Sequence, residues 1–292
     1  MLDATFYDTL SRLQLRMIYK SSRSLSGSRK SLQKGQSAEF SDFREYRPGD
    51  DLRRLDWNAY ARLDRLYIRE YMEEKEAMVS VLIDTSASMD YGACSKAELS
   101  QDLAAAVSFL ALNHMDRLCL YDMKAMEKGL SAGGGRSAFA RVLHWLENRS
   151  FGGEVDLLEA ARKMPRRGPG ITILISDFLH PDMLEEEKQR YEKLLRYLAY
   201  CRQRPVVLHT MASEELRIPW EGARNLIDAE TGNRLRLTVD KKAVTQYEGQ
   251  LARLIGRMKK GCAAAQGAYV LCDAKKDRKR LVFEDLRVIY DI

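Results

Sequence analysis

The sequence lacks the signals that would direct a chain into or across a membrane. Its most apolar stretch, residues 103–112, is about ten residues long and is interrupted by Ser108, whereas a bilayer-spanning helix needs about twenty apolar residues. Asp3 and Asp8 place negative charge where a secretory leader carries positive charge, and no apolar segment with a small-residue cleavage site follows. We therefore expect a cytoplasmic protein.

Cysteine and histidine are too scattered to form a metal centre by themselves. The five cysteines include no C-x-x-C pair, which argues against a disulfide framework and against a thiolate zinc site. None of the four histidines stands at a metal-ligand spacing from another. The glycine triplet 133–135 is not followed by Lys-Ser or Lys-Thr, so a nucleotide-binding loop is not predicted either.

The chain also has little excess of charge. Its 48 basic and 42 acidic residues give +6, and residues 1–37 alone hold seven basic and two acidic residues, so the remainder is nearly neutral. A fold built to hold nucleic acid would carry a basic stripe across one face. The basic serine-rich loop at 20–37 and the basic run 275–280 leave open a local contact with an anion or nucleic acid.

Apolar strands alternate with amphipathic helices over most of the chain. Strands are predicted at 78–83, 117–121, 171–175, 206–210 and 268–272, and helices are predicted between them. Residues 228–233 are predicted to form the turn of a hairpin. This order predicts an α/β fold: a doubly wound, mostly parallel sheet with helices on both faces.

A helical and β extension is expected to precede this domain, so that residues 1–76 form the extension and 77–292 the α/β domain. In its first helix, Phe6 and Leu10 share the face that should dock on the body. Asp50, Asp51 and Asp56 alternate with arginines further along. A structural ion-pair network is the favoured interpretation of these carboxylates, ahead of an acid–base cluster.

Oxygen-bearing side chains follow two of the apolar strands. Asp84, Ser86 and Ser88 come directly after residues 78–83, and Asp177 follows shortly after residues 171–175. Because ligands collect at the carboxyl ends of parallel strands near a topological switch point, these side chains are expected to meet. A hard oxygen set without thiol or imidazole suits Mg²⁺ or Mn²⁺ better than zinc.

The motifs resemble a known family. Asp84-Thr-Ser-Ala-Ser88 is similar to the metal-ion-dependent adhesion site of von Willebrand factor type A domains. More narrowly, Arg44-Glu-Tyr-Arg-Pro-Gly-Asp-Asp51, Asp56-Trp57 and Ala61-Arg62 resemble the signature of domain-of-unknown-function family 58. The resemblance extends over about residues 35–275 and implies a von Willebrand factor A-like fold.

The resemblance also implies roles for individual residues. Ser86 and Ser88 would ligate a divalent cation directly, and Asp84 and Asp177 would act directly or through water. The family's third loop usually supplies a threonine, but Val155 stands in its place here and offers no lone pair. The cation would be Mg²⁺ or Mn²⁺, held weakly unless another ligand substitutes.

A rim for a binding partner is expected around this site. Glu154 could replace the missing hydroxyl, and it is expected to line the rim together with Thr85, Asp156 and His180. The resemblance implies that such a protein works with a MoxR-type AAA+ ATPase in assembling or remodelling protein complexes.

We therefore expect a non-catalytic interaction module, in which an acidic side chain of the partner completes the metal's coordination. One alternative is a metal-assisted hydrolase, which would need Glu154, Asp156 or His180 as its base. The other is anion or nucleic-acid binding through the basic loops. No activated nucleophile accompanies the oxygen ligands, so an enzyme is not expected.

Overall fold

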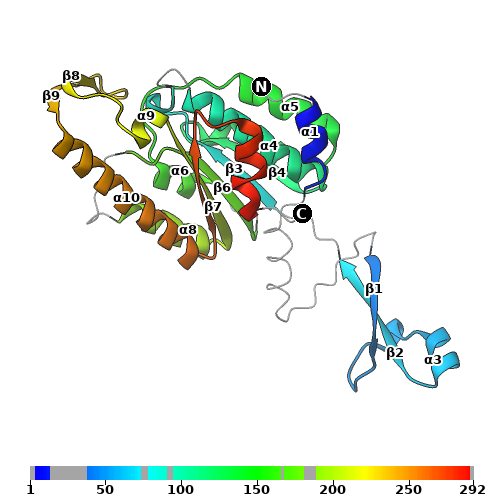
Figure 1. Cartoon of the computed structure of the whole chain (residues 1–292). Helices are drawn as coiled ribbons and strands as arrows, with labels where there is room; N and C mark the ends of the chain where they lie inside the picture. The colour runs from blue at the N-terminus through cyan, green and yellow to red at the C-terminus, as the bar shows by residue number, and fades with distance from the viewer. Residues whose placement is uncertain are drawn as a thin grey trace. The chain divides into compact units, whose positions relative to one another are not determined.

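Two compact units make up the part of the chain that the computed structural model describes, residues 4–13, 38–73, 78–90, 95–165, 168–180 and 189–289. Residues 4–13 group with 78–289, and residues 38–73 form the second unit (Figure 1). Helix α1 (Ala4–Leu10) thus belongs to the larger unit, whereas the expected division at residue 76 assigned it to the extension. The basic loop at 20–37 lies outside the described residues.

A six-stranded sheet forms the centre of the larger unit. Its spatial order is β10 (Ala268–Asp273), β7 (Gln203–Met211), β6 (Gly170–Ser176), β3 (Met78–Ile83), β4 (Arg117–Asp122) and β5 (Leu130–Ala132). Neighbouring strands are parallel except β4 and β5, which are antiparallel. The mostly parallel sheet is confirmed, and only the short strand β5 was not predicted, because three residues carry no periodic signal.

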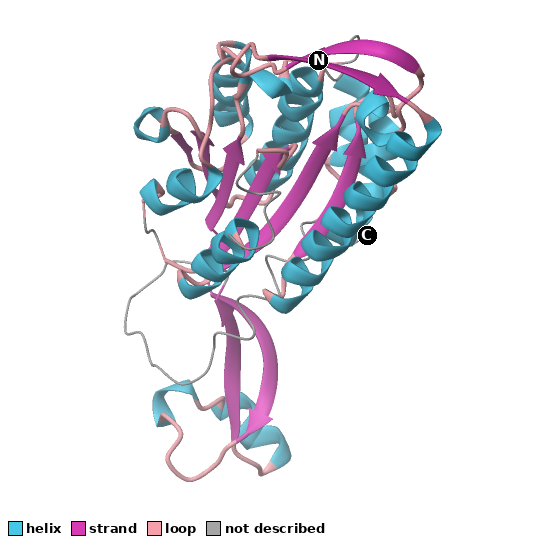
Figure 2. Cartoon of the chain, turned by 90° about the vertical axis from the view of Figure 1, so that its left-hand side faces the viewer, coloured by secondary structure: helices cyan, strands magenta, loops and turns pink. Residues whose placement is uncertain are grey.

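Helices cover both faces of this sheet (Figures 1 and 2). Side chains of α1, α4 (Lys96–Asn113), α5 (Arg136–Glu147) and α11 (Arg278–Phe283) pack in one apolar cluster, and those of α6 (Leu157–Lys163), α8 (Arg190–Tyr200) and α10 (Lys241–Ala264) pack in another. Val81 and Ile83 point into the first cluster and Leu82 into the second, as the alternation of a strand requires. This two-sided core confirms the doubly wound arrangement.

Helix α4 explains the most apolar stretch of the sequence. Residues 103–107 are buried on every face of the helix because α4 lies between the sheet and the helices α1 and α5. Ser95 caps its first turn, accepting hydrogen bonds from the backbone N–H groups of Ala97 and Glu98. Within the described residues, no helix is both long enough and apolar enough to span a bilayer.

A β-hairpin projects from the larger unit between α9 (Ser213–Leu216) and α10. Its strands, β8 (Gly222–Ile227) and β9 (Arg234–Val239), pair antiparallel across the predicted turn at 228–233. Figures 1 and 2 show the hairpin projecting from the start of α10 at the level of the strand ends to which the arrows of the sheet point. The hairpin is therefore on the same side as the strand-end loops.

The second unit is also a hairpin, formed by β1 (Ala38–Glu45) and β2 (Tyr67–Glu73), with the short helices η1 (Leu52–Arg54) and α3 (Trp57–Leu63) between them. Pro48 and Gly49 form the central pair of a turn closed by Asp50 N–H donating to Arg47 O, with Gly49 at φ +100° as a type II turn requires.

The carboxylates of this unit correct one expectation. Asp50 pairs with Arg44 at 2.9 Å. Asp51 and Asp56, however, accept hydrogen bonds from the first backbone N–H groups of η1 and α3. Helix capping therefore accounts for two of the three carboxylates that were expected to form an ion-pair network.

Docking of α1 gives a direct test of the larger unit. Phe6 is 1% exposed, and its ring centroid lies 5.3 Å from that of Phe283. We expect Phe6→Ala to lower the free energy of unfolding by about 3 kcal/mol, since it removes a buried aromatic ring. Guanidinium denaturation measures the loss, with exposed Asp8→Ala as the control. An unchanged midpoint for Phe6→Ala would show that α1 is not part of the core.

Candidate functional site

The candidate site lies at the topological switch point of the sheet. From β3 the chain continues to β4 on one side, whereas from β6 it continues to β7 on the other, so the order reverses between β3 and β6. Asp84 and Asp177 leave the sheet there, and the Asp84 N–H donates to Ile175 O at 2.9 Å. The two motifs, 92 residues apart from Asp84 to Ser176, are thus brought together as parallel-sheet geometry predicts.

The Asp84 carboxylate joins the two strand ends. One oxygen accepts the Ser86 N–H at 2.9 Å, and the other accepts the Ser176 hydroxyl at 2.6 Å. Burial, followed by the nearby Asp177 carboxylate, raises the pKa of Asp84 to about 6. The carboxylate therefore holds the Ser86 loop against β6.

The hydroxyls of Ser86 and Ser88 lie 3.1 Å apart, and Ser88 is half-buried. In octahedral magnesium coordination, with metal–oxygen distances near 2.1 Å, adjacent ligand oxygens are about 3.0 Å apart. The two hydroxyls thus fit neighbouring positions of a divalent cation. Within the described residues, no group of three or more His, Cys, Asp or Glu side chains could hold a metal ion.

The third loop is attached directly to the first. Gly152 N–H donates to Thr85 O at 2.8 Å, and Ala87 N–H donates to Gly153 O at 2.9 Å. Gly153 has φ +70°, a left-handed conformation that suits glycine. These bonds place the exposed Glu154 beside the serine loop.

Three residues of this region have structural roles, and the buried Thr85 is the one that contradicts its expected place on the rim. Val155 is 5% exposed and lies in the apolar cluster that includes Leu82 and Phe178, so its side chain is part of the core. Thr85 is fully buried, and its hydroxyl donates to Asp122 at 2.6 Å, so it supports the loop instead of lining a rim. Asp156 caps α6 and pairs with Arg190.

Sequence reasoning missed a buried cation at this site. The Lys96 ammonium lies 2.8 Å from an Asp177 oxygen and 2.6 Å from a Glu215 oxygen, with its side chain fully buried. Burial lowers the pKa of Lys96, but the two carboxylates outweigh it and the pKa lies above its ordinary value. One signal was available: a lysine in the first turn of an apolar helix, where the helix dipole disfavours positive charge.

His209 lies close to the site but carries no charge there. It is fully buried between the rings of Phe178 and Tyr269, and its Nδ1 lies 2.7 Å from the Tyr269 hydroxyl oxygen. Burial lowers the pKa of His209 to about 4, so the imidazole is neutral at physiological pH. His180, the histidine expected on the rim, is half-buried three residues beyond Asp177.

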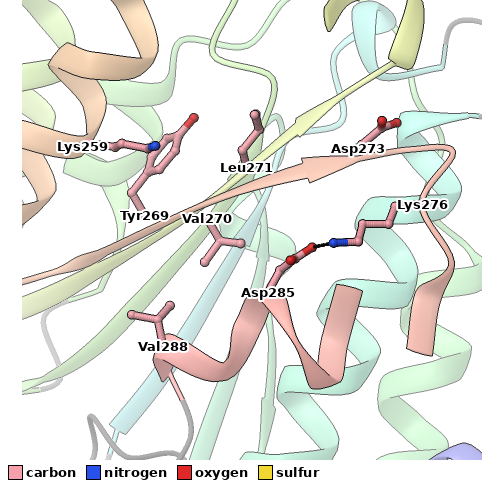
Figure 3. Close-up of a pocket in the computed structure, with 8 residues that line it drawn as sticks. All are labelled: Lys259, Tyr269, Val270, Leu271, Asp273, Lys276, Asp285 and Val288. Carbon is pink, nitrogen blue, oxygen red and sulfur yellow. Dashed lines mark hydrogen bonds and ion pairs between the residues drawn. The ribbon is translucent and has the colours of Figure 1, made fainter. Parts of the chain in front are cut away.

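A separate groove of about 470 Å³ follows the edge strand β10 (Figure 3). Its lining includes Tyr269, Lys259 and the ion pair between Lys276 and Asp285, whose charged atoms are 2.5 Å apart. None of the serine and aspartate side chains of the candidate site lines it. The groove and the candidate site therefore have different lining residues.

The buried Asp84 predicts a pH dependence of stability in metal-free protein. Because its pKa is higher in the folded than in the unfolded chain, folding takes up a proton, and stability falls as the pH rises from its ordinary pKa of 3.8 to about 6. The expected loss is on the order of 2–3 kcal/mol. Denaturation in EDTA across this range should show the decline in the parent and a flatter profile in Asp84→Asn; identical profiles would contradict the assignment.

Lys96 predicts a second effect on stability. Lys96→Met leaves Asp177 and Glu215 without their buried counter-cation, and we expect a loss of about 3–5 kcal/mol. Lys275→Met, which removes an exposed ion pair with Glu214, should cost less than about 1 kcal/mol. Adding Asp177→Asn to Lys96→Met should recover part of the loss. Equal effects of the two lysine substitutions would refute the buried-cation role.

Two solved structures resemble the fold at low similarity. One is the conserved hypothetical protein BatB from Bacteroides thetaiotaomicron, with 16% identity and a TM-score of 0.41, covering 73% of this chain and 98% of that one. The other is an aerotolerance-related membrane protein from Bacteroides fragilis, with 14% identity and a TM-score of 0.43, covering 73% and 99%.

Sequence relatives give a firmer assignment. Uncharacterized proteins of Mycobacterium tuberculosis and Mycobacterium bovis are each 29% identical over 270 residues, which is 87% of this chain and 81% of theirs. Residues 42–253 match the family described as protein of unknown function DUF58. The matched range includes the Arg-Pro-Gly-Asp-Asp block and both strand-end motifs. Because this match covers well over half of the chain, the protein belongs to the DUF58 family.

Proposed function

We propose that this protein is a non-catalytic interaction module whose larger unit is a von Willebrand factor A-like domain with a divalent-cation site. Ser86 and Ser88 would hold Mg²⁺ or Mn²⁺ directly, with Asp84 and Asp177 acting mainly through water. One position of the cation remains for an acidic side chain of a partner. The observation that carries this proposal is the pair of hydroxyls 3.1 Å apart at the switch point of the sheet.

The surrounding hydrogen bonds support binding over catalysis. The buried hydroxyls of Thr85 and Ser176 donate to carboxylates that position the loops. The buried imidazole of His209 is neutral and is engaged with Tyr269. A hydrolase would need a base facing the metal-bound water, and of the three candidate bases Asp156 is already engaged as the cap of α6 and in the ion pair with Arg190.

The basic run near the C-terminal end supports a protein partner over a nucleic acid. Lys275 pairs with Glu214, Lys276 with Asp285, and Arg278 with Asp102. Cations that are already paired contribute less to the phosphate contacts of a nucleic-acid surface. We propose a cytoplasmic MoxR-type AAA+ ATPase as the partner, in the assembly or remodelling of protein complexes, on the basis of the family resemblance.

Co-purification with a MoxR-type ATPase from the same organism tests this function. Complex formation should require Mg²⁺ or Mn²⁺, should be lost in EDTA, and should weaken about tenfold or more in the double variant Ser86→Ala, Ser88→Ala, equivalent to about 1.4 kcal/mol. Ser11→Ala, in the turn that follows α1, is the control.

Two results would overturn the proposal. If EDTA and the serine double variant both leave binding of the ATPase unchanged, the contact lies elsewhere on the protein. Metal-dependent hydrolysis of phosphoester, peptide or nucleotide substrates that is lost in Asp84→Ala would establish the hydrolase instead.

A further inference from the structure

The β8–β9 hairpin has almost no core of its own. All six residues of β8 are exposed, and in β9 only Leu237 and Val239 are shielded from solvent. Figures 1 and 2 show the hairpin projecting from the start of α10, at the level of the strand ends to which the arrows of the sheet point. A segment with so few buried apolar contacts has low local stability, which is typical of covers and lids.

The tip of the hairpin is nevertheless well defined. Asp228 accepts hydrogen bonds from the N–H groups of Glu230 at 2.9 Å and Thr231 at 2.7 Å, and Gly232 N–H donates to Asp228 O. From residue 221 to residue 236, Glu230 is the one residue that is half-buried, and the others are exposed. The turn therefore directs this carboxylate toward the protein body.

Glu230 faces the candidate site. Partial burial raises the pKa of Glu230, as do the carboxylates of Asp177, Asp84 and Glu154, whereas His180 lowers it. Glu230 thus interacts electrostatically with carboxylates of three other segments at this edge of the sheet. Lys96 compensates part of this charge through Asp177. The remaining like charges repel one another, and a divalent cation would offset that repulsion.

We infer that the hairpin is a cation-operated cover of this site, and that Glu230 occupies the solvent-facing position of the bound cation until an acidic partner displaces it. This inference rests on the proposed cation site and adds its regulation. Without the cation, repulsion loosens the cover; with the cation, Glu230 is drawn onto the site. The hairpin thereby competes with the partner for one coordination position, which restricts binding to partners that outcompete it.

Hydrogen exchange of the full chain tests this directly. Adding Mn²⁺ to EDTA-treated protein should slow exchange of the amides of residues 222–239 by about tenfold, which corresponds to about 1.4 kcal/mol. Glu230→Gln reduces the repulsion between carboxylates, so exchange of these amides in EDTA should be slower than in the parent. The same substitution removes the proposed ligand, so adding Mn²⁺ should no longer slow the exchange. Glu221→Gln, at the exposed base of the hairpin, makes the same charge change and should behave like the parent.

Calorimetric titration with Mn²⁺ separates the inference from the function on which it rests. Parent protein that binds Mn²⁺ with no change in hairpin exchange, and with the same affinity in Glu230→Gln, overturns the cover and leaves the site standing. Parent protein that binds no Mn²⁺ overturns both. Loss of binding in Asp84→Asn, with a weaker but measurable affinity in Glu230→Gln, is the expected result.

Discussion

The buried carboxylate of Asp84 is the interaction on which the carboxyl edge of the sheet depends. Its two oxygens are shared between the backbone of the serine loop and the hydroxyl at the end of β6, so one side chain fixes two strand ends. Burying this charge is unfavourable without compensation, as its raised pKa shows. The hydrogen bonds from the Ser176 hydroxyl and the Ser86 N–H offset part of that cost, because they favour the charged form of Asp84.

Charge balance at this edge is distributed over distant parts of the chain. Lys96 joins the end of β6 to α9 through Asp177 and Glu215, and α9 leads directly into the β8–β9 hairpin. The Tyr247 hydroxyl donates to the backbone oxygen of Glu215 at 2.6 Å, which adds α10 to the same assembly. A change in charge at the strand ends is thus physically connected to the elements that carry the hairpin.

The DUF58 match extends across both units. The Arg-Pro-Gly-Asp-Asp block forms a turn and helix caps in the smaller unit, and the serine and aspartate motifs lie in the larger one. In the smaller unit, α3 buries none of its side chains and exposes Trp57 and Leu63. The family signature therefore combines a capped helix with exposed apolar side chains and a polar strand-end site.

The sequence by itself determined the alternation of strands and helices, the switch-point placement of Asp84 and Asp177, and the hairpin turn at residues 228–233. Hydrophobic periodicity, strand ends and turn residues are local properties, and each is readable within a few positions. Only the tertiary structure decided the pairing of Lys96 with Asp177 and Glu215, the burial of Thr85 and Val155, and the approach of Glu230. Those features join residues that are far apart in the chain; Lys96 and Glu215, for example, are separated by 119 positions. Burial and Coulomb interaction depend on distance in space, which no local pattern encodes.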